Sequence, residues 1–129
     1  MAKAFTVSEW FPASPEEIYF AWLDSQGHSN MTGSPARVSS KVGEEFEAWD
    51  GYIHGKNLEL EPGARILQSW RTVEFDPSEP DSLLEIVFEP AQNGTKVTLH
   101  HSKLPAHGSQ YEQGWIDSYF EPMKEYFKR

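Results

Sequence analysis

GWIDSYFEPMKEYF, residues 114–127, is the stretch that decides the fold of this chain. At 100° per residue, its apolar side chains gather on one side of a helix. One stripe holds Trp115, Tyr119, Met123 and Tyr126, and beside it lie Ile116, Phe120 and Phe127. The charged residues take the opposite side. The pattern therefore predicts a long helix whose aromatic side packs against another layer.

Local signals mark the start and the middle of this helix. Ser109 and Glu112 have the spacing of a capping box, which predicts a helix that begins near residue 110. Pro122 lacks a backbone amide and crowds the carbonyl of Ser118, so we expect a kink there.

The layer under the helix is predicted from alternating segments between residues 36 and 103. They indicate strands at Glu45–Trp49, Tyr52–Leu60, Arg65–Val73, Leu83–Glu89 and Thr95–Ser102. Asp50-Gly51 and Asn93-Gly94 are the signals of tight hairpins. Apolar positions share one face along the last two strands, at Leu84, Ile86 and Phe88 and at Val97, Leu99 and His101. This pattern is typical of an antiparallel sheet with one buried face.

The N-terminal part completes the order of elements. Residues 4–11 alternate as a strand does, and the capping box Ser14-Pro15-Glu16-Glu17 predicts a helix from about 15 to 24. Residues 25–33 are predicted to form a short second helix. One strand, two helices, six strands and a long helix make the helix-grip arrangement. We therefore predict an α+β fold, a curved antiparallel sheet of about six or seven strands around a long C-terminal helix.

Length and composition exclude several classes of protein and several kinds of site. The 129 residues suit one domain, 1–129, and the absence of cysteine excludes disulfides, thiolate nucleophiles and iron–sulfur clusters. Eleven Lys and Arg oppose twenty Asp and Glu, and a net charge of −9 without a basic cluster disfavours nucleic acid. No apolar run is long enough to insert in a membrane, and no secretory signal is visible. The expectation is a soluble, cytoplasmic monomer.

Three stretches carry a resemblance to a known family. They are the opening helix Ser14–Tyr19, the segment Phe46–Gly55 with Ile66–Arg71, and Gly114-Trp115 with Tyr119-Phe120 and Lys124–Phe127. The sequence resembles the C-terminal domain family of the activator of the heat-shock-protein-90 ATPase. That family lies in the START-like, birch-pollen-allergen-like superfamily. The resemblance implies the helix-grip fold and a binding function.

Two functions remain open at this point. The first is a non-enzymatic domain that binds a small apolar molecule in a cavity between the sheet and the C-terminal helix. The second is a domain that acts through its surface on a chaperone of the heat-shock-protein-90 type, as the resemblance implies. No nucleophile elbow or paired acid and base is present, so we expect neither an enzyme nor a cofactor. Some members of the superfamily are cyclases or lyases.

The candidate cavity residues are the large side chains predicted on the inner faces of helix and sheet. They are Trp22, Met31, Phe46, Trp70, Ile86, His101, Trp115, Tyr119 and Met123. The same residues can instead fill the core completely. His54 and His101 are both expected on the inner face, more as hydrogen-bonded core residues than as ligand contacts. His100 and His101 point to opposite faces of a strand and cannot chelate one ion, so no metal is expected.

Overall fold

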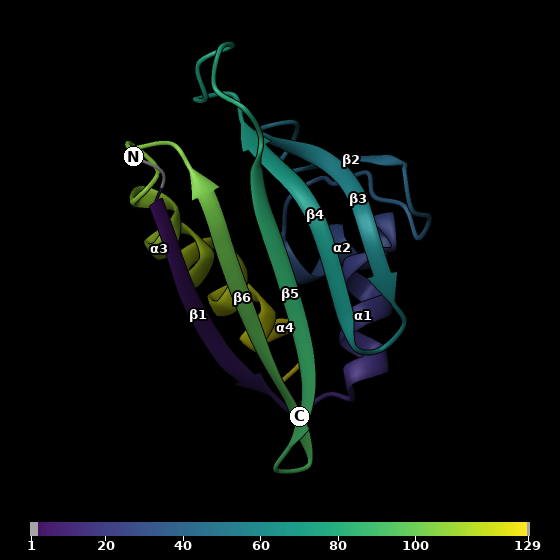
Figure 1. The fold of residues 1–129 in the computed structure, drawn as a ribbon. Coiled ribbons are helices and arrows are strands. Elements are labelled where there is room, and N and C mark those ends of the chain that lie inside the picture. The colour runs from purple at the N-terminus through teal and green to yellow at the C-terminus, as the bar shows by residue number, and fades with distance from the viewer. Residues whose placement is uncertain (1–2, 129) are drawn as a thin grey trace.

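A computed structural model of the chain describes residues 3–128. Six antiparallel strands form one curved sheet in the order β1-β6-β5-β4-β3-β2 (Figure 1). The strands are β1 Lys3–Phe11, β2 Glu45–Ala48, β3 Ile53–Glu61, β4 Arg65–Thr72, β5 Ser82–Ala91 and β6 Gly94–Leu104. The predicted α+β helix-grip class is confirmed. The predicted order had six strands after the first two helices, but the structure has five. Each of the five alternating segments forms one strand.

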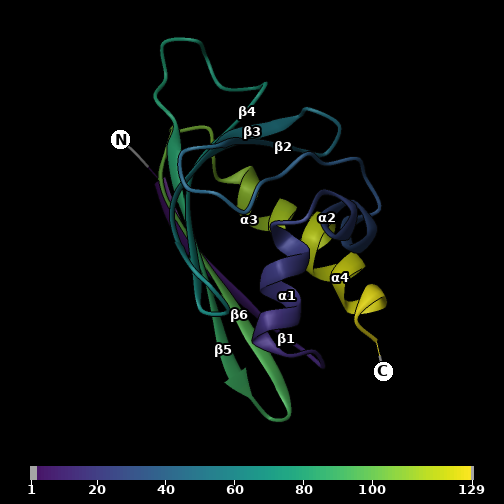
Figure 2. The same ribbon diagram turned by 90° about the vertical axis from the view of Figure 1, so that its right-hand side faces the viewer.

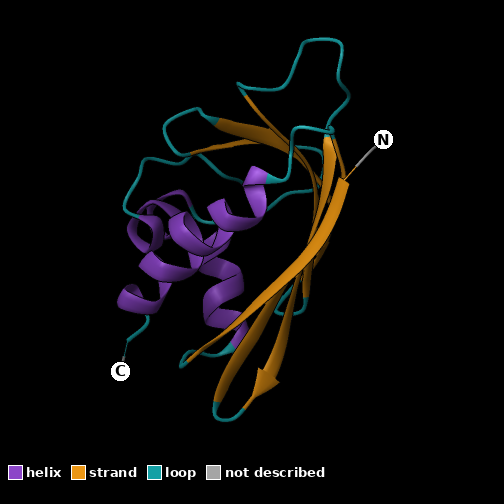
Figure 3. Ribbon diagram, turned by 90° about the vertical axis from the view of Figure 1, so that its left-hand side faces the viewer, coloured by secondary structure: helices purple, strands orange, loops and turns teal. Residues whose placement is uncertain are grey.

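The helices all lie on one face of the sheet (Figures 2 and 3). They are α1 Pro15–Trp22, α2 Ser25–Thr32, α3 Gln110–Trp115, the π-helical turn η1 Ile116–Phe120 and α4 Glu121–Tyr126. The last three follow one another without a break and make up the C-terminal helix. None of the helices within residues 3–128 combines the length and the apolar content that crossing a membrane requires.

Caps decide where the two short helices begin and end. The Ser14 hydroxyl accepts a hydrogen bond from the Glu17 amide at 3.1 Å, as the capping box predicts. α1 ends at Trp22, two residues before the predicted end, since Asp24 leaves the helix to cap α2 by accepting from the Gly27 amide at 2.8 Å. The predicted second helix is confirmed.

The core lies between the concave face of the sheet and the helices. The predicted inward residues of β5 and β6 are all buried: Leu84, Ile86, Phe88, Val97, Leu99 and His101. His54 is exposed, against the prediction that it faces inward, because Ile53 takes the inward position and neighbouring residues of a strand alternate.

Both predicted hairpins form, the second with its turn shifted by one residue. Gln92 and Asn93 have φ of 49° and 63° and make the turn, while Gly94 already pairs with Ala91 in the sheet. Glycine is required at position 94 for space. A Cβ there would lie 2.2 Å from the carbonyl oxygen of Phe11.

The C-terminal helix begins at Gln110 as predicted, but Ser109 makes no side-chain cap and is itself helical. Where a kink was expected, the chain forms η1 directly before Pro122, and the Glu121 amide bonds to the Ile116 carbonyl five residues back. This turn holds one extra residue and rotates the following residues by about 100°. Tyr126, predicted on the buried stripe, is therefore 47% exposed, whereas Phe127, predicted beside the stripe, is buried.

Candidate functional site

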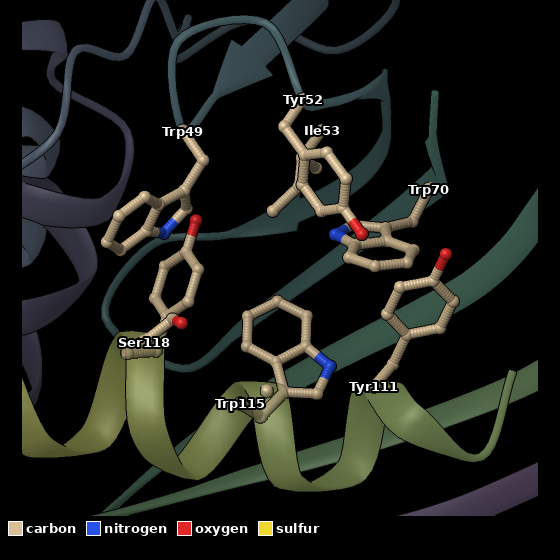
Figure 4. Close-up of a pocket in the computed structure, with 9 residues that line it drawn as sticks. Trp49, Tyr52, Ile53, Trp70, Tyr111, Trp115 and Ser118 are labelled. Carbon is tan, nitrogen blue, oxygen red and sulfur yellow. The ribbon is translucent and has the colours of Figure 1, made fainter. Parts of the chain in front are cut away.

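A pocket of about 260 Å³ opens between the first half of the C-terminal helix and the β2–β3 turn (Figure 4). None of its lining residues is charged. They are Trp49, Tyr52, Ile53, Trp70, Tyr111, Gly114, Trp115, Ser118 and Tyr119. Those on the floor are buried, and those at the mouth, Trp49, Tyr52, Gly114 and Ser118, are partly exposed.

The walls are aromatic rings that hold one another in place. The Trp115 ring centroid lies 5.6 Å from that of Trp70 and 4.6 Å from that of Tyr119. Tyr111 meets Trp70 edge to face at 5.0 Å. Rings at these distances attract one another beyond their apolar burial. The pocket is therefore formed before anything enters it.

A chain of hydrogen bonds behind the floor orients two of these rings. The Trp115 indole donates to His101 Nδ1 at 3.0 Å, so the His101 proton lies on Nε2, which donates to the Ser82 hydroxyl at 2.9 Å. Ser82 in turn donates to the Trp70 carbonyl at 2.6 Å. Burial lowers the pKa of His101 to about 3, so its ring is neutral. His101 is a hydrogen-bonded core residue that supports the pocket from behind.

A second histidine, His28 of α2, anchors Tyr119. Its Nδ1 donates to the Trp22 carbonyl at 2.8 Å, so Nε2 accepts the Tyr119 hydroxyl proton at 2.8 Å. Burial lowers the pKa of His28 to about 4, although its bond to the Trp22 carbonyl acts in the opposite direction. Burial also raises the pKa of Tyr119. Sequence reasoning missed His28, because α2 is polar and carries no pattern that marks a buried position.

The other two tyrosines of the pocket also have partners for their hydroxyls. Tyr111 shares a 2.6 Å hydrogen bond with the Thr72 hydroxyl, and Tyr52 donates to Glu74. Burial and the bond to Glu74 raise the pKa of Tyr52. Glu74 also accepts from the Gln110 side chain at 3.1 Å. A carboxylate thus stands beside the mouth without lining it.

Trp49 differs from these residues. Its indole nitrogen is buried and has no hydrogen-bond partner among the described residues 3–128. Its backbone also lies in the left-handed region, with φ of 53°. Both features are costly for a tryptophan. The predicted turn at Asp50-Gly51 could have drawn attention to the two large aromatic residues beside it, Trp49 and Tyr52.

The predicted cavity residues divide into three groups. Trp70, Trp115 and Tyr119 line the pocket. Trp22 stacks on Tyr119 at 5.1 Å, so that Trp22 and His101 form a second layer behind the lining. The remaining four, Met31, Phe46, Ile86 and Met123, are buried in the core and do not line it. They belong to the hydrophobic core cluster.

The chemistry available at the pocket is apolar contact, ring stacking and hydrogen bonding. Within residues 3–128, no group of three His, Asp or Glu side chains lies close enough to hold a metal ion.

Comparison with known proteins identifies the family. The family model described as Activator of Hsp90 ATPase homolog 1-like protein matches residues 12–128. The chain belongs to this family. Within the activator family, the human protein "Activator of 90 kDa heat shock protein ATPase homolog 1" is 28% identical over 95% of this chain. The match covers 36% of the human protein, so the chain spans about a third of the length of that relative.

Two of the solved structures that match share the fold of this chain. An HSP90 activator from Plasmodium falciparum matches with a TM-score of 0.86 and 24% identity, covering 95% of this chain and 94% of that one. The Aha1 dimer from Colwellia psychrerythraea matches with a TM-score of 0.81 and 18% identity, covering 98% and 96% of the two chains. At these identities the matches establish the fold.

Proposed function

We propose that this chain is a non-catalytic binding domain that takes a small apolar ring compound into the aromatic pocket. Gly114 is the observation that carries the proposal. Glycine inside a helix costs about 1 kcal/mol relative to alanine. A Cβ at this position would meet nothing within 4 Å, so packing does not require glycine here. Keeping the mouth of the pocket open accounts for it.

The size and walls of the pocket indicate the size of its occupant. A dry cavity of about 150 Å³ holds one benzene ring. The pocket of about 260 Å³ would therefore accept a molecule of roughly two fused rings. Flat aromatic walls favour a flat occupant, since stacked rings make the largest contact.

The residues around the pocket favour binding over catalysis. Both buried histidines use their two ring nitrogens in hydrogen bonds to the protein. Burial keeps both rings neutral, so neither is available as a general acid near neutral pH.

Thermal melts with a panel of neutral one-ring and two-ring compounds test this function. A bound compound at a hundredfold excess over its Kd stabilises the native state by about 2.7 kcal/mol, which raises the melting temperature by several degrees. Gly114→Met should place a side chain over the mouth and abolish the shift. Glu112→Met, on the exposed side of α3, is the matched control and should keep it. If no compound shifts the wild-type melt, the proposal fails.

A second candidate function is favoured by the comparisons. The curated relatives are called activators of a 90 kDa heat shock protein ATPase. By this proposal the domain would act in the cytoplasm, as a monomer, through its surface on a chaperone of that type. Titration of the labelled protein with such a chaperone separates the two candidates. Amide shifts at exposed charged residues support the surface, whereas no shift at any chaperone concentration argues against it.

A further inference from the structure

Two indole donors of the pocket, those of Trp49 and Trp70, have no hydrogen-bond partner among residues 3–128, and of the two only the Trp49 nitrogen is fully buried. The hydroxyls of Tyr52, Tyr111 and Tyr119 are bonded to Glu74, Thr72 and His28. Ser118 lies at the mouth, where its hydroxyl is open to water. Only the Trp49 indole nitrogen among the polar side-chain atoms of residues 3–128 is both buried and unpaired.

The turn holds Trp49 in this position. The Asp50 amide donates to the Pro35 carbonyl at 2.9 Å, and the Val73 amide donates to the Tyr52 carbonyl at 3.0 Å. These bonds tie both sides of the turn to neighbouring segments. Figure 4 shows the nitrogen-bearing edges of Trp49 and Trp70 turned toward the space between them. A large residue kept at positive φ with an unmet donor is a costly arrangement, and such arrangements gather at functional sites.

Charge decides what kind of acceptor can meet this donor. The lining carries no positive charge, and Glu74 stands beside the mouth. The net charge of the chain is −9. A carboxylate or phosphate would be desolvated here without a cation to pair with, which is strongly unfavourable. A neutral oxygen such as a ketone or ester carbonyl meets the donor without that cost.

We infer that the pocket selects flat, neutral compounds that carry a carbonyl-type acceptor, and that Trp49 Nε1 donates the hydrogen bond that holds this acceptor. The inference rests on the proposed function, because it specifies the occupant of the same pocket. The Trp49 nitrogen is buried while the residue as a whole is only partly buried at the mouth, so binding by this route requires a small rotation of the indole that opens the nitrogen to an entering oxygen. Trp49 is then a specificity-determining residue, and hydrocarbon rings of the same size bind without its hydrogen bond.

A matched pair of probes tests the inference. 1-Indanone and indane share one two-ring frame and differ by the carbonyl group. The measured quantity is the ratio of their Kd values, compared between the wild type and Trp49→Phe, which keeps an aromatic wall but removes the donor. A single neutral hydrogen bond is worth about 1 kcal/mol, so the ratio should change by roughly five- to tenfold in favour of indane.

Trp10→Phe is the control, because the Trp10 indole donates to the Ala91 carbonyl at 2.6 Å and does not line the pocket. It should leave the ratio unchanged. The five indole N–H signals of the 15N-labelled protein give a second readout. The signal that Trp49→Phe removes should move downfield with 1-indanone and less with indane.

The outcomes separate the two claims. If both probes bind and Trp49→Phe leaves their ratio unchanged, Trp49 is not the donor, and the apolar-binding function stands without it. If neither probe binds to the wild type at its solubility limit, the proposed function fails together with this inference.

Discussion

Both ends of the helix–sheet interface are built mainly from aromatic residues, but only one of them leaves an open pocket. At the packed end, formed by Phe11, Phe120, Met123 and Phe127, ring centroids lie 5.9 and 6.2 Å apart and every side chain is at most 2% exposed. At the pocket end, formed by Trp49, Trp70, Tyr111, Trp115 and Tyr119, a space of about 260 Å³ remains.

The difference lies in the polar tips of the rings. The side chains of phenylalanine and methionine have no hydrogen-bonding group that must be oriented toward a partner. At the packed end they therefore approach one another until the space is filled. Trp115 and Tyr119 must also reach His101 and His28, which keeps their rings at angles that do not close the gap. Directional bonds at one end thus preserve a volume that undirected packing removes at the other.

The largest expected effect is the loss of a ring at the pocket end. Trp115→Ala should lower the free energy of unfolding by about 3–5 kcal/mol, because it removes a buried aromatic side chain and leaves His101 without its donor. Tyr126→Ala is the control, and at 47% exposure it should change stability by about 0.5 kcal/mol or less. Denaturant unfolding measures both. A loss below 1 kcal/mol for Trp115→Ala would contradict the burial seen here.

The next effect is a dependence of stability on pH that comes from the two buried histidines of the pocket end. The folded pKa values of His28 and His101, about 4 and about 3, lie below the unfolded value of about 6.5. The unfolded chain therefore binds more protons at acidic pH. The stability these histidines contribute is complete above pH 6.5 and is lost as the pH falls toward 4 and 3.

Each histidine should remove roughly 1.4 kcal/mol per pH unit in this window. Denaturant unfolding between pH 7 and 5 measures the slope. His28→Gln should reduce it by about half, whereas His100→Gln, at an exposed position of β6, should not. Equal slopes in all three proteins would show that the buried His28 ring is not held neutral.

A substitution of Pro122 tests whether this proline determines which side chains are buried at the packed end. Pro122→Ala restores an amide and lets a regular α-helix compete with η1, which would bring Tyr126 toward the place of Phe127. We expect looser docking and a loss of roughly 1 kcal/mol. Faster amide exchange at residues 123–127 would support this reading. Slower exchange there would mean that the proline merely interrupts the helix.

The smallest expected effect is a gain in stability from a substitution at the pocket end. Gly114→Ala should raise the free energy of unfolding by about 0.5–1 kcal/mol, because the added Cβ enters open space and the helix loses a glycine. Gly55→Ala is the contrast, because a Cβ there would lie 1.9 Å from the Ser69 carbonyl oxygen and must destabilise. A destabilising Gly114→Ala would show that the mouth is tighter than the structure has it.

How far the sequence could predict the site varies along the C-terminal helix. Up to Phe120 the predicted phase was right, since a regular helix obeys its period. Beyond η1 the prediction was wrong for Tyr126, which is exposed, whereas Met123 and Phe127 are buried. A π-helical turn changes the period locally, and Pro122 by itself indicated a kink rather than an inserted residue.

The sequence by itself determined which faces are apolar, the antiparallel sheet, the long covering helix and the candidate rings Trp70, Trp115 and Tyr119. Those features follow from local periodicity and capping, which each segment carries within a few residues. Only the tertiary structure decided that His28 meets Tyr119 across 91 residues, that the Trp49 nitrogen stays unpaired, and that a pocket remains. A pairing between distant residues and an unfilled volume both depend on how whole elements settle against each other. No single segment encodes that result.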